Sequence, residues 1–238
     1  MCPLRGQSLE SRLAAQSSVR RAQGTVAAAK TCTYCGGTAS TDDHVPPRRL
    51  FARPWPADLI TVPSCQSCNG GAKKDDEYFI WALTCSASAV GDEAARARSQ
   101  RFKLPVPPHR RTMVNRLWRS YLPVMAVTPA GLAVGMTAGY RVETERLHRV
   151  LARIVRGLYF HETKERVAGA MKVFTSFEPP TARERAVVRG FLHENERTIA
   201  RGAFRYSLVP HPQISGLTVC PMVFFEDLLA IGRVEKHA

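Results

Sequence analysis

The fold is decided by the stretch "CTYCGGTASTDDHVPPRRL", residues 32–50, which holds two cysteines, two aspartates and a histidine. A second pair of cysteines follows in "CQSCN", residues 65–69. Each Cys-x-x-Cys pair presents two thiolates from one tight turn, and two such turns together close a tetrahedral cage of four sulfurs around zinc. We therefore predict one structural zinc ion, bound by Cys32, Cys35, Cys65 and Cys68.

The cysteine count also bears on the compartment. Seven cysteines are an odd number, and the first thirty residues contain no apolar stretch typical of a secretory signal. Both features favour a reducing compartment, where paired cysteines bind metals more often than they form disulfides. We expect a cytoplasmic protein in which Cys2, Cys85 and Cys220 are ordinary thiols.

The charge of the chain points to a polyanionic partner. Lys and Arg together number 34 against 20 Asp and Glu, which gives a formal net charge of +14. This excess favours association with nucleic acid or an anionic surface. No window approaches the roughly 18 consecutive apolar residues that a membrane span requires, so we expect no membrane partner. Nucleic acid is the expected partner, with DNA favoured over RNA.

Four regions are expected along the chain. These are a basic N-terminal arm (1–29), a cysteine-containing core (30–90), a basic helical or linker segment (91–122) and a mixed helix and strand region (123–238). We predict helices over 74–88, 111–122, 143–160 and 181–197, a hairpin over 124–136, and strands over 170–177, 202–210 and 216–234. The clearest helix is 143–160, whose apolar residues recur on one face. These are Leu147, Leu151, Ile154 and Leu158.

The acidic residues and the histidine between the cysteine pairs need a separate explanation. A zinc ion held by four sulfurs has no open position for chemistry. Asp42, Asp43 and His44 are therefore either loop residues without a chemical role or part of a second, oxygen-rich site. Oxygen ligands suit a hard cation such as Mg²⁺ or Mn²⁺, and Asn69 would supply a further oxygen.

The residues "CTYCGGTASTDDHVPP" and "DLITVPSCQSCNGGAKKDDEYF" resemble the HNH endonucleases, which have a ββα-metal core often held by a four-cysteine zinc site. The resemblance covers about a fifth of the chain. It implies an α+β fold in which a zinc-stabilised ββα-metal core is followed by the mixed C-terminal region. It also implies a metal-dependent endonuclease that hydrolyses phosphodiester bonds.

By the same resemblance, Asp43 and Asn69 bind the catalytic Mg²⁺ or Mn²⁺ and His44 is the general base. Asp58 stands where the family usually has an asparagine that orients this histidine. A carboxylate accepts a hydrogen bond from the imidazole but cannot donate one as an amide does.

The chemistry agrees with these residue types. A neutral imidazole takes a proton from water near neutral pH, and a bound cation stabilises charge on the phosphate and on the departing oxygen. Basic side chains within the core are expected to contact the nucleic-acid backbone. These are Arg48, Arg49, Arg53, Lys73 and Lys74, although a solvated face is an equal alternative for the two lysines.

Two other functions remain open from the sequence. A non-catalytic zinc-ribbon module that binds nucleic acid would need the cysteines and arginines but has no use for Asp43 with His44. Alternatively, the chain is a subunit of a larger defence or mobile-element system, in which the C-terminal region binds a protein partner.

Overall fold

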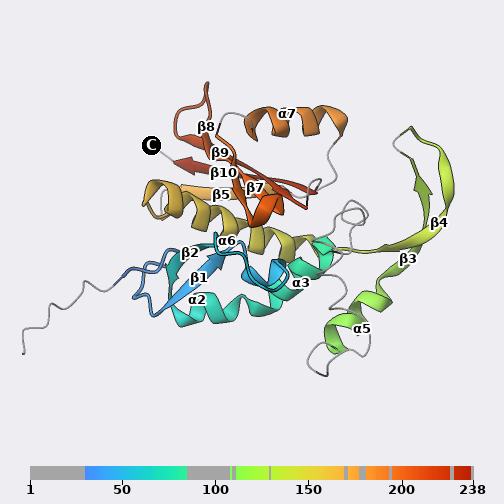
Figure 1. Cartoon of the computed structure of the whole chain (residues 1–238), viewed down its shortest axis with the longest axis horizontal. Helices are drawn as coiled ribbons and strands as arrows, with labels where there is room; N and C mark the ends of the chain where they lie inside the picture. Colours follow the sequence, from blue (N-terminus) through green and yellow to red (C-terminus); the bar gives the residue numbers. More distant parts are fainter. Residues whose placement is uncertain are drawn as a thin grey trace, which may run out of the picture. The chain divides into compact units, whose positions relative to one another are not determined.

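The computed structural model describes residues 30–84, 108, 111–128, 130–168, 171–176, 181–192, 195–225 and 228–236. The predicted arm at 1–29 and most of the predicted basic segment, 91–107, lie outside these ranges. Residues Thr31–Ala238 form one compact unit, in which helices and strands are mixed as the predicted α+β class requires (Figure 1). Within the described ranges, no helix is long and apolar enough to cross a membrane.

The N-terminal part of this unit is a small two-stranded sheet followed by helices. Strand β1 (Thr41–Val45) pairs antiparallel with β2 (Ile60–Ser64), and His44 lies opposite Thr61. A short 3-10 helix, η2 (Arg48–Leu50), lies in the connection between the strands. Helices α2 (Gln66–Gly71) and α3 (Lys73–Thr84) follow β2. This strand–strand–helix order is compatible with a ββα arrangement.

The C-terminal part is built on a second antiparallel sheet. Its strand order is β5-β10-β9-β7-β6, and β8 pairs with β9 beside this path. The strands are β5 (Met171–Ser176), β6 (Arg197–Ile199), β7 (Phe204–Tyr206), β8 (Val209–Pro210), β9 (Leu217–Phe224) and β10 (Leu228–Lys236). Helix α7 (Ala182–Leu192) precedes β6, and the 3-10 helix η6 (Ala200–Gly202) joins β6 to β7.

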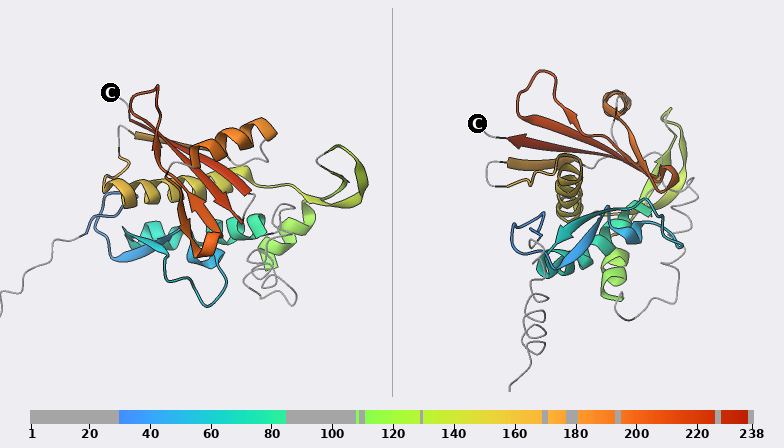
Figure 2. Two further views of the ribbon diagram at one scale, coloured as in Figure 1. Left: turned by 45° about the horizontal axis from the view of Figure 1, so that its top comes forward. Right: turned by 60° about the vertical axis from the view of Figure 1, so that its left-hand side comes forward.

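Helix α6 (Thr144–Thr163) connects the two parts (Figure 2). All four apolar residues that predicted its inner face are buried. Its neighbours in one continuous core include Val45 from β1, Phe79 from α3 and Phe224 from β9. The rings of Phe79 and Phe224 lie 5.6 Å apart, edge to face. The regions delimited from sequence as 30–90 and 123–238 therefore share one hydrophobic core.

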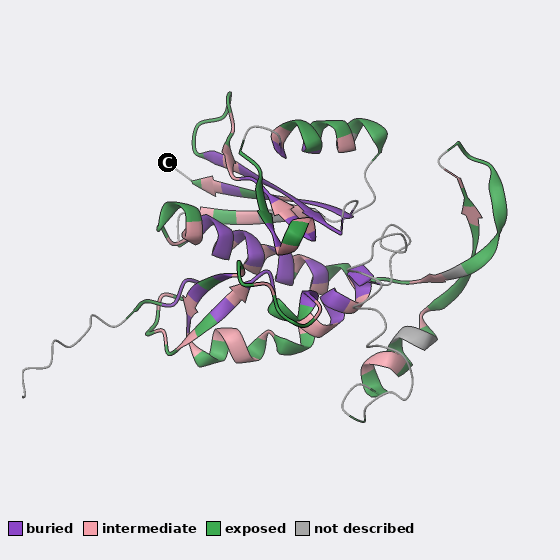
Figure 3. Cartoon of the chain, viewed as in Figure 1, coloured by how far each residue is buried: buried purple, intermediate pink, exposed green. Residues whose placement is uncertain are grey.

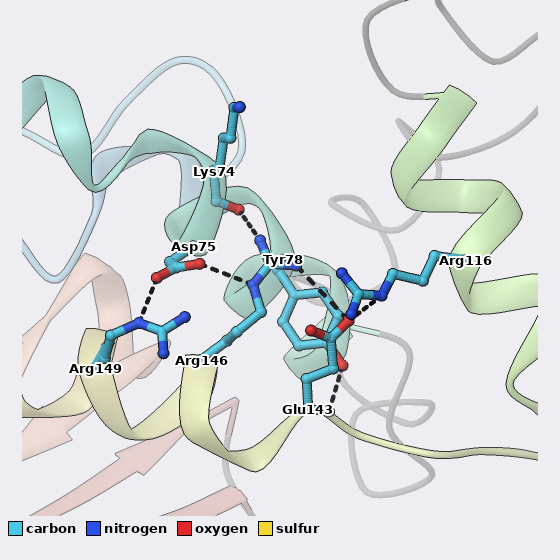
Figure 4. Close-up of polar contacts among 7 residues, drawn as sticks. All are labelled: Lys74, Asp75, Tyr78, Arg116, Glu143, Arg146 and Arg149. Carbon is cyan, nitrogen blue, oxygen red and sulfur yellow. Dashed lines mark hydrogen bonds and ion pairs between the residues drawn. The ribbon is translucent and has the colours of Figure 1, made fainter.

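Ion pairs fix α6 against α3 along their exposed side (Figure 4). Both oxygens of Asp75 are engaged, since Arg146 Nε and Arg149 Nε each lie 2.8 Å from one of them. Arg146 also donates to the carbonyl oxygen of Lys74 at 2.7 Å. Because α3 contributes to the pocket described below, these contacts help to hold one wall of that pocket.

A separate hairpin extends from this unit. Strands β3 (Tyr121–Val127) and β4 (Ala133–Tyr140) pair only with each other among the described strands. At its base, the ring of Tyr140 packs on Trp81 with centroids 4.6 Å apart, and its hydroxyl donates to the carbonyl of Ala82. Most of the hairpin is exposed (Figure 3). The hairpin predicted over 124–136 is confirmed and is longer than expected.

Several predicted elements differ in extent. The helix expected over 181–197 is α7, which ends at Leu192, and Arg197 already belongs to β6. The helix expected over 111–122 is α5 (Arg111–Arg119); Tyr121 begins β3, and Pro123 disfavours helical geometry at Leu122. The strand expected over 216–234 is instead the hairpin β9–β10, whose turn includes Phe225 at a φ of 49°. The segment 202–210 likewise contains two strands, and β6 was not predicted.

Candidate metal centre and adjoining pocket

The four predicted zinc cysteines come together. Cys32 and Cys35 lie in a turn that reverses at Gly36, whose φ of 81° suits glycine, and the Gly36 amide donates to the Cys32 carbonyl. Cys65 caps the start of α2 and Cys68 lies in its first turn. The ligand atoms of all four lie within 4.8 Å of one another.

The spacing of the sulfurs fits a tetrahedral metal ion. Zinc–sulfur bonds of about 2.3 Å place the sulfurs of a regular tetrahedron about 3.8 Å apart. Cys35 Sγ and Cys65 Sγ are separated by 3.6 Å. The cluster can therefore hold a metal ion such as zinc, and four sulfurs would leave that ion no open position.

The thiols differ in acidity. A hydrogen bond with the Ser67 hydroxyl lowers the pKa of Cys65 to about 6, whereas burial, aided by neighbouring thiols, raises the pKa of Cys68 to about 12. Without a cation, four thiolates would repel one another, so the cluster retains protons. Binding of a metal ion releases them, which makes its affinity pH-dependent.

A pocket of about 320 Å³ adjoins this cluster. Three of the predicted catalytic residues, Asp43, His44 and Asn69, line it. The other lining residues are Asp42, Pro47, Arg48, Arg49, Lys73, Asp76 and Glu77. Strand β1, helix η2 and helices α2 and α3 all contribute, so the short-range order of strand, strand and helix brings these side chains to one place.

Asp43 is the most restrained residue of the pocket. It is only 6% exposed, and its Oδ2 atom accepts a 2.7 Å hydrogen bond from the hydroxyl of Tyr34. The same oxygen lies 3.5 Å from Arg153 Nε. Arg153 also donates to Asp76 Oδ1 at 2.6 Å, so one guanidinium bridges two carboxylates. Burial raises the pKa of Asp76, and Arg153 opposes this effect.

His44 lies on the same strand in a half-buried position. Burial lowers the pKa of its imidazole, the positive charge of Arg48 lowers it further, and Asp43 partly opposes both effects. The result is an imidazole that is predominantly neutral at neutral pH, which is the form that accepts a proton.

Asn69 is held by its amide nitrogen. Nδ2 donates to Thr41 Oγ1 and to the carbonyl of Asp42, both at 3.2 Å, which ties α2 to β1. Because the nitrogen is used in this way, the amide oxygen is the atom left to act as a ligand. One carboxylate and one amide oxygen are a small set, but Mg²⁺ commonly retains several waters beside one or two carboxylates.

Asp58 is not brought into this pocket. It is exposed, it is absent from the pocket lining, and its Oδ2 accepts a 3.0 Å hydrogen bond from the amide of Ala200. The role expected for Asp58, orienting His44, therefore has no geometric support. Its place in the loop before β2 was visible in the sequence, but its partner, 142 residues away, was not.

The predicted basic residues divide into two groups. Arg48, Arg49 and Lys73 line the pocket, whereas Arg53 and Lys74 do not. Arg53 and Arg48 both lie over the ring of Trp55, at 4.4 and 4.2 Å from its centroid. These two guanidinium groups and a 36% exposed indole form a basic, aromatic edge beside the pocket.

Sequence analysis missed Tyr34, Asp76 and Arg153. Tyr34 stands between the first two cysteines, where no pattern distinguishes it, and Asp76 lies in the first turn of α3, where acidic residues are common because of the helix dipole. Arg153 did leave a signal, since arginines recur at 146, 149, 153 and 156, the spacing of one helix face. That spacing does not reveal which carboxylates the arginines meet.

No protein family, curated protein or solved structure matches this chain. The function must therefore be argued from the pocket itself.

Proposed function

We propose that this protein is a metal-dependent endonuclease of the HNH type that hydrolyses phosphodiester bonds, with DNA as the favoured substrate. One observation carries the proposal: Asp43, His44 and Asn69 line a single pocket next to a four-cysteine cluster. Arg48, Arg49 and Lys73 line the same pocket and supply the positive charge that a phosphate backbone requires.

Each residue has a distinct role in this proposal. His44, neutral at working pH, accepts the proton of the attacking water. Asp43 and Asn69 would hold Mg²⁺ or Mn²⁺ through oxygen atoms. The bound cation would supply charge stabilisation for the phosphate and for the departing oxygen. The cysteine cluster takes no part in the reaction. It would fix the turn that contains Cys32 and Cys35 against the start of α2, which carries Asn69.

The ion pair between Asp43 and Arg153 predicts weak binding of a cation at Asp43. The guanidinium of Arg153 already lies 3.5 Å from Oδ2 of this carboxylate, so a cation would meet an oxygen whose negative charge is partly offset. A buried carboxylate that lacked such partners would bind a cation more tightly but would destabilise the fold without metal. We therefore expect activity to require free metal at high concentration.

The same contacts support a second candidate function. If Asp43 serves only to neutralise Arg153, the pocket has no catalytic role, and the protein is a zinc-stabilised module that binds nucleic acid. Its cysteines and arginines would suffice for that purpose, with a protein partner for the C-terminal region if it belongs to a larger system.

Cleavage assays distinguish the two functions. Plasmid DNA and structured RNA are incubated with the full-length, zinc-loaded protein, with and without Mg²⁺ or Mn²⁺. We expect metal-dependent cleavage, and we expect His44→Ala to reduce its rate about 10²–10⁴-fold with unchanged zinc content and nucleic-acid affinity. His161→Ala, at the end of α6 and outside the pocket lining, is the matched control. Binding without cleavage under every metal condition would favour the second candidate.

A further inference from the structure

The hairpin β3–β4 has a composition unlike that of the rest of the chain. Residues 121–140 contain no charged side chain, although the whole chain carries a net charge of +14. Eight large apolar residues of the hairpin are between 39 and 70% exposed. They are Tyr121, Leu122, Val124, Met125, Val127, Leu132, Val134 and Met136.

The exposed area is large enough for a stable contact. Given their exposed fractions, these eight side chains present roughly 800 Å², which is about the area that one partner contributes to a standard protein interface. Isolated apolar residues on a surface need no explanation, but eight exposed apolar side chains on one uncharged hairpin mark an interaction site. The patch lies on both faces of a two-stranded sheet that no other described strand covers.

The free edges of β3 and β4 differ in how readily they can pair with a further strand. Pro123 in β3 lacks an amide donor and therefore blunts the outer edge of that strand. Strand β4 contains neither proline nor charge, two features that protect an edge. Its β-bulge lies near the turn, between the pairs Ala126–Gly135 and Val127–Ala133, so β4 is regular from Met136 to Tyr140. It also carries Gly135, where an added Cβ would meet no atom within 4 Å, and glycine in a strand permits another backbone to approach closely.

We propose that the hairpin is a dimerisation arm, whose β4 edge pairs antiparallel with β4 of a second copy of this chain about a twofold axis. Such pairing joins two hairpins into one four-stranded sheet with the same surface on both partners. The hairpin carries no charge, so two chains of +14 can meet through it without bringing like charges into contact. The proposal is independent of the proposed nuclease activity.

The register shows where a charge would disrupt this contact. Met125 lies directly opposite Met136, so both side chains point to the same face of the sheet. Both are more than half exposed, at 53 and 64%. Met136 lies on β4, the strand proposed to pair, so glutamate at 136 is accommodated by the monomer, whereas pairing of β4 with β4 brings the two glutamates toward each other. Like charges brought together at an interface disfavour association.

The test is the oligomeric state of the full-length, zinc-loaded protein, freed of nucleic acid. Sedimentation velocity at high salt and several concentrations should give twice the 26.4 kDa chain mass. Met136→Glu should raise the dissociation constant about 100-fold or more. Val187→Glu places the same charge on a 52% exposed valine of α7 and should leave the dimer intact. Zinc content and circular dichroism verify the folding of each variant.

A second measurement locates the contact. Amide hydrogen exchange of residues 133–140 should slow as the protein concentration rises, because pairing protects the edge of β4. A wild type that stays monomeric at all concentrations overturns the proposal. So does a dimer that survives in Met136→Glu, or a monomer whose hairpin instead binds anionic lipid vesicles.

Discussion

The hydroxyl of Tyr34 donates a 2.7 Å hydrogen bond to the carboxylate of Asp43. Tyr34 lies between Cys32 and Cys35, so the turn that carries these two cysteines directly contacts the residue proposed to hold the catalytic cation. Burial raises the pKa of Tyr34 and the negative charge of Asp43 raises it further, so the phenol keeps its proton and remains a donor. This short hydrogen bond thus joins the turn that carries Cys32 and Cys35 to the pocket.

Replacing Tyr34 with phenylalanine tests this connection. Tyr34→Phe should keep its zinc but need about tenfold more Mg²⁺ or Mn²⁺ for half-maximal cleavage, because Asp43 loses the donor that fixes its orientation. The measurement is the cleavage rate against metal concentration. Tyr206→Phe is the matched control, since Tyr206 makes an equally short bond to Glu162 outside this pocket. An unchanged metal requirement in Tyr34→Phe would show that the hydroxyl does not position Asp43.

The cysteine cluster should contribute directly to folding. Cys65→Ser removes one ligand of the proposed zinc site, and we expect loss of bound zinc together with a decrease of several kcal/mol in the free energy of unfolding. Elemental analysis and thermal unfolding measure the two effects. Cys220→Ala, a buried cysteine outside the cluster, should lose some stability and no zinc. A Cys65→Ser protein with full zinc content and wild-type stability would contradict the assignment.

The contact between α3 and α6 should make stability depend on pH. Burial raises the pKa of Asp75, but hydrogen bonds from Arg149 and Arg146 outweigh it, so the net shift is downward. The resulting stabilisation is present above the unfolded-state pKa of about 3.9 and is lost as pH falls through the lower folded-state pKa.

Asp75→Asn should therefore reduce the free energy of unfolding by about 1 kcal/mol at pH 7, the upper range for a partly exposed ion pair. The difference from wild type should shrink below about pH 4, where Asp75 of the wild type becomes protonated. Urea unfolding of both proteins at several pH values measures this difference in the free energy of unfolding. Glu145→Gln, an exposed change on α6, is the control. A difference independent of pH would mean that the ion pairs do not stabilise the helix contact.

Local patterns predicted the elements whose signals are short-range. The two Cys-x-x-Cys pairs predicted the sulfur cluster because each pair presents both of its sulfurs from a single turn. Apolar spacing predicted the buried face of α6 because one side of that helix meets the core. The hairpin was also readable, since two apolar runs flank a turn at residues 128–131.

Contacts between distant segments could not be read in this way. Arg153 meets Asp43 across 110 positions of sequence, and Asp58 meets Ala200 across 142. Both contacts depend on how α6 and the C-terminal sheet pack on the N-terminal strands. The family resemblance placed Asp58 beside His44 by analogy of position alone, and packing against η6 gave it another partner.

The basic edge beside the pocket should govern binding of nucleic acid. Arg48 and Arg53 stack on Trp55, and Arg49 lines the pocket with Arg48. Replacing all three arginines with glutamine should weaken binding and reduce the slope of log affinity against log salt by about 2.7 on duplex DNA, since each phosphate contact contributes about 0.9. Fluorescence anisotropy at several salt concentrations measures the slope. The matched control removes the same charge at the exposed residues Arg183, Arg189 and Arg233. If both triple variants lower the slope equally, binding follows net charge alone and the edge has no special role.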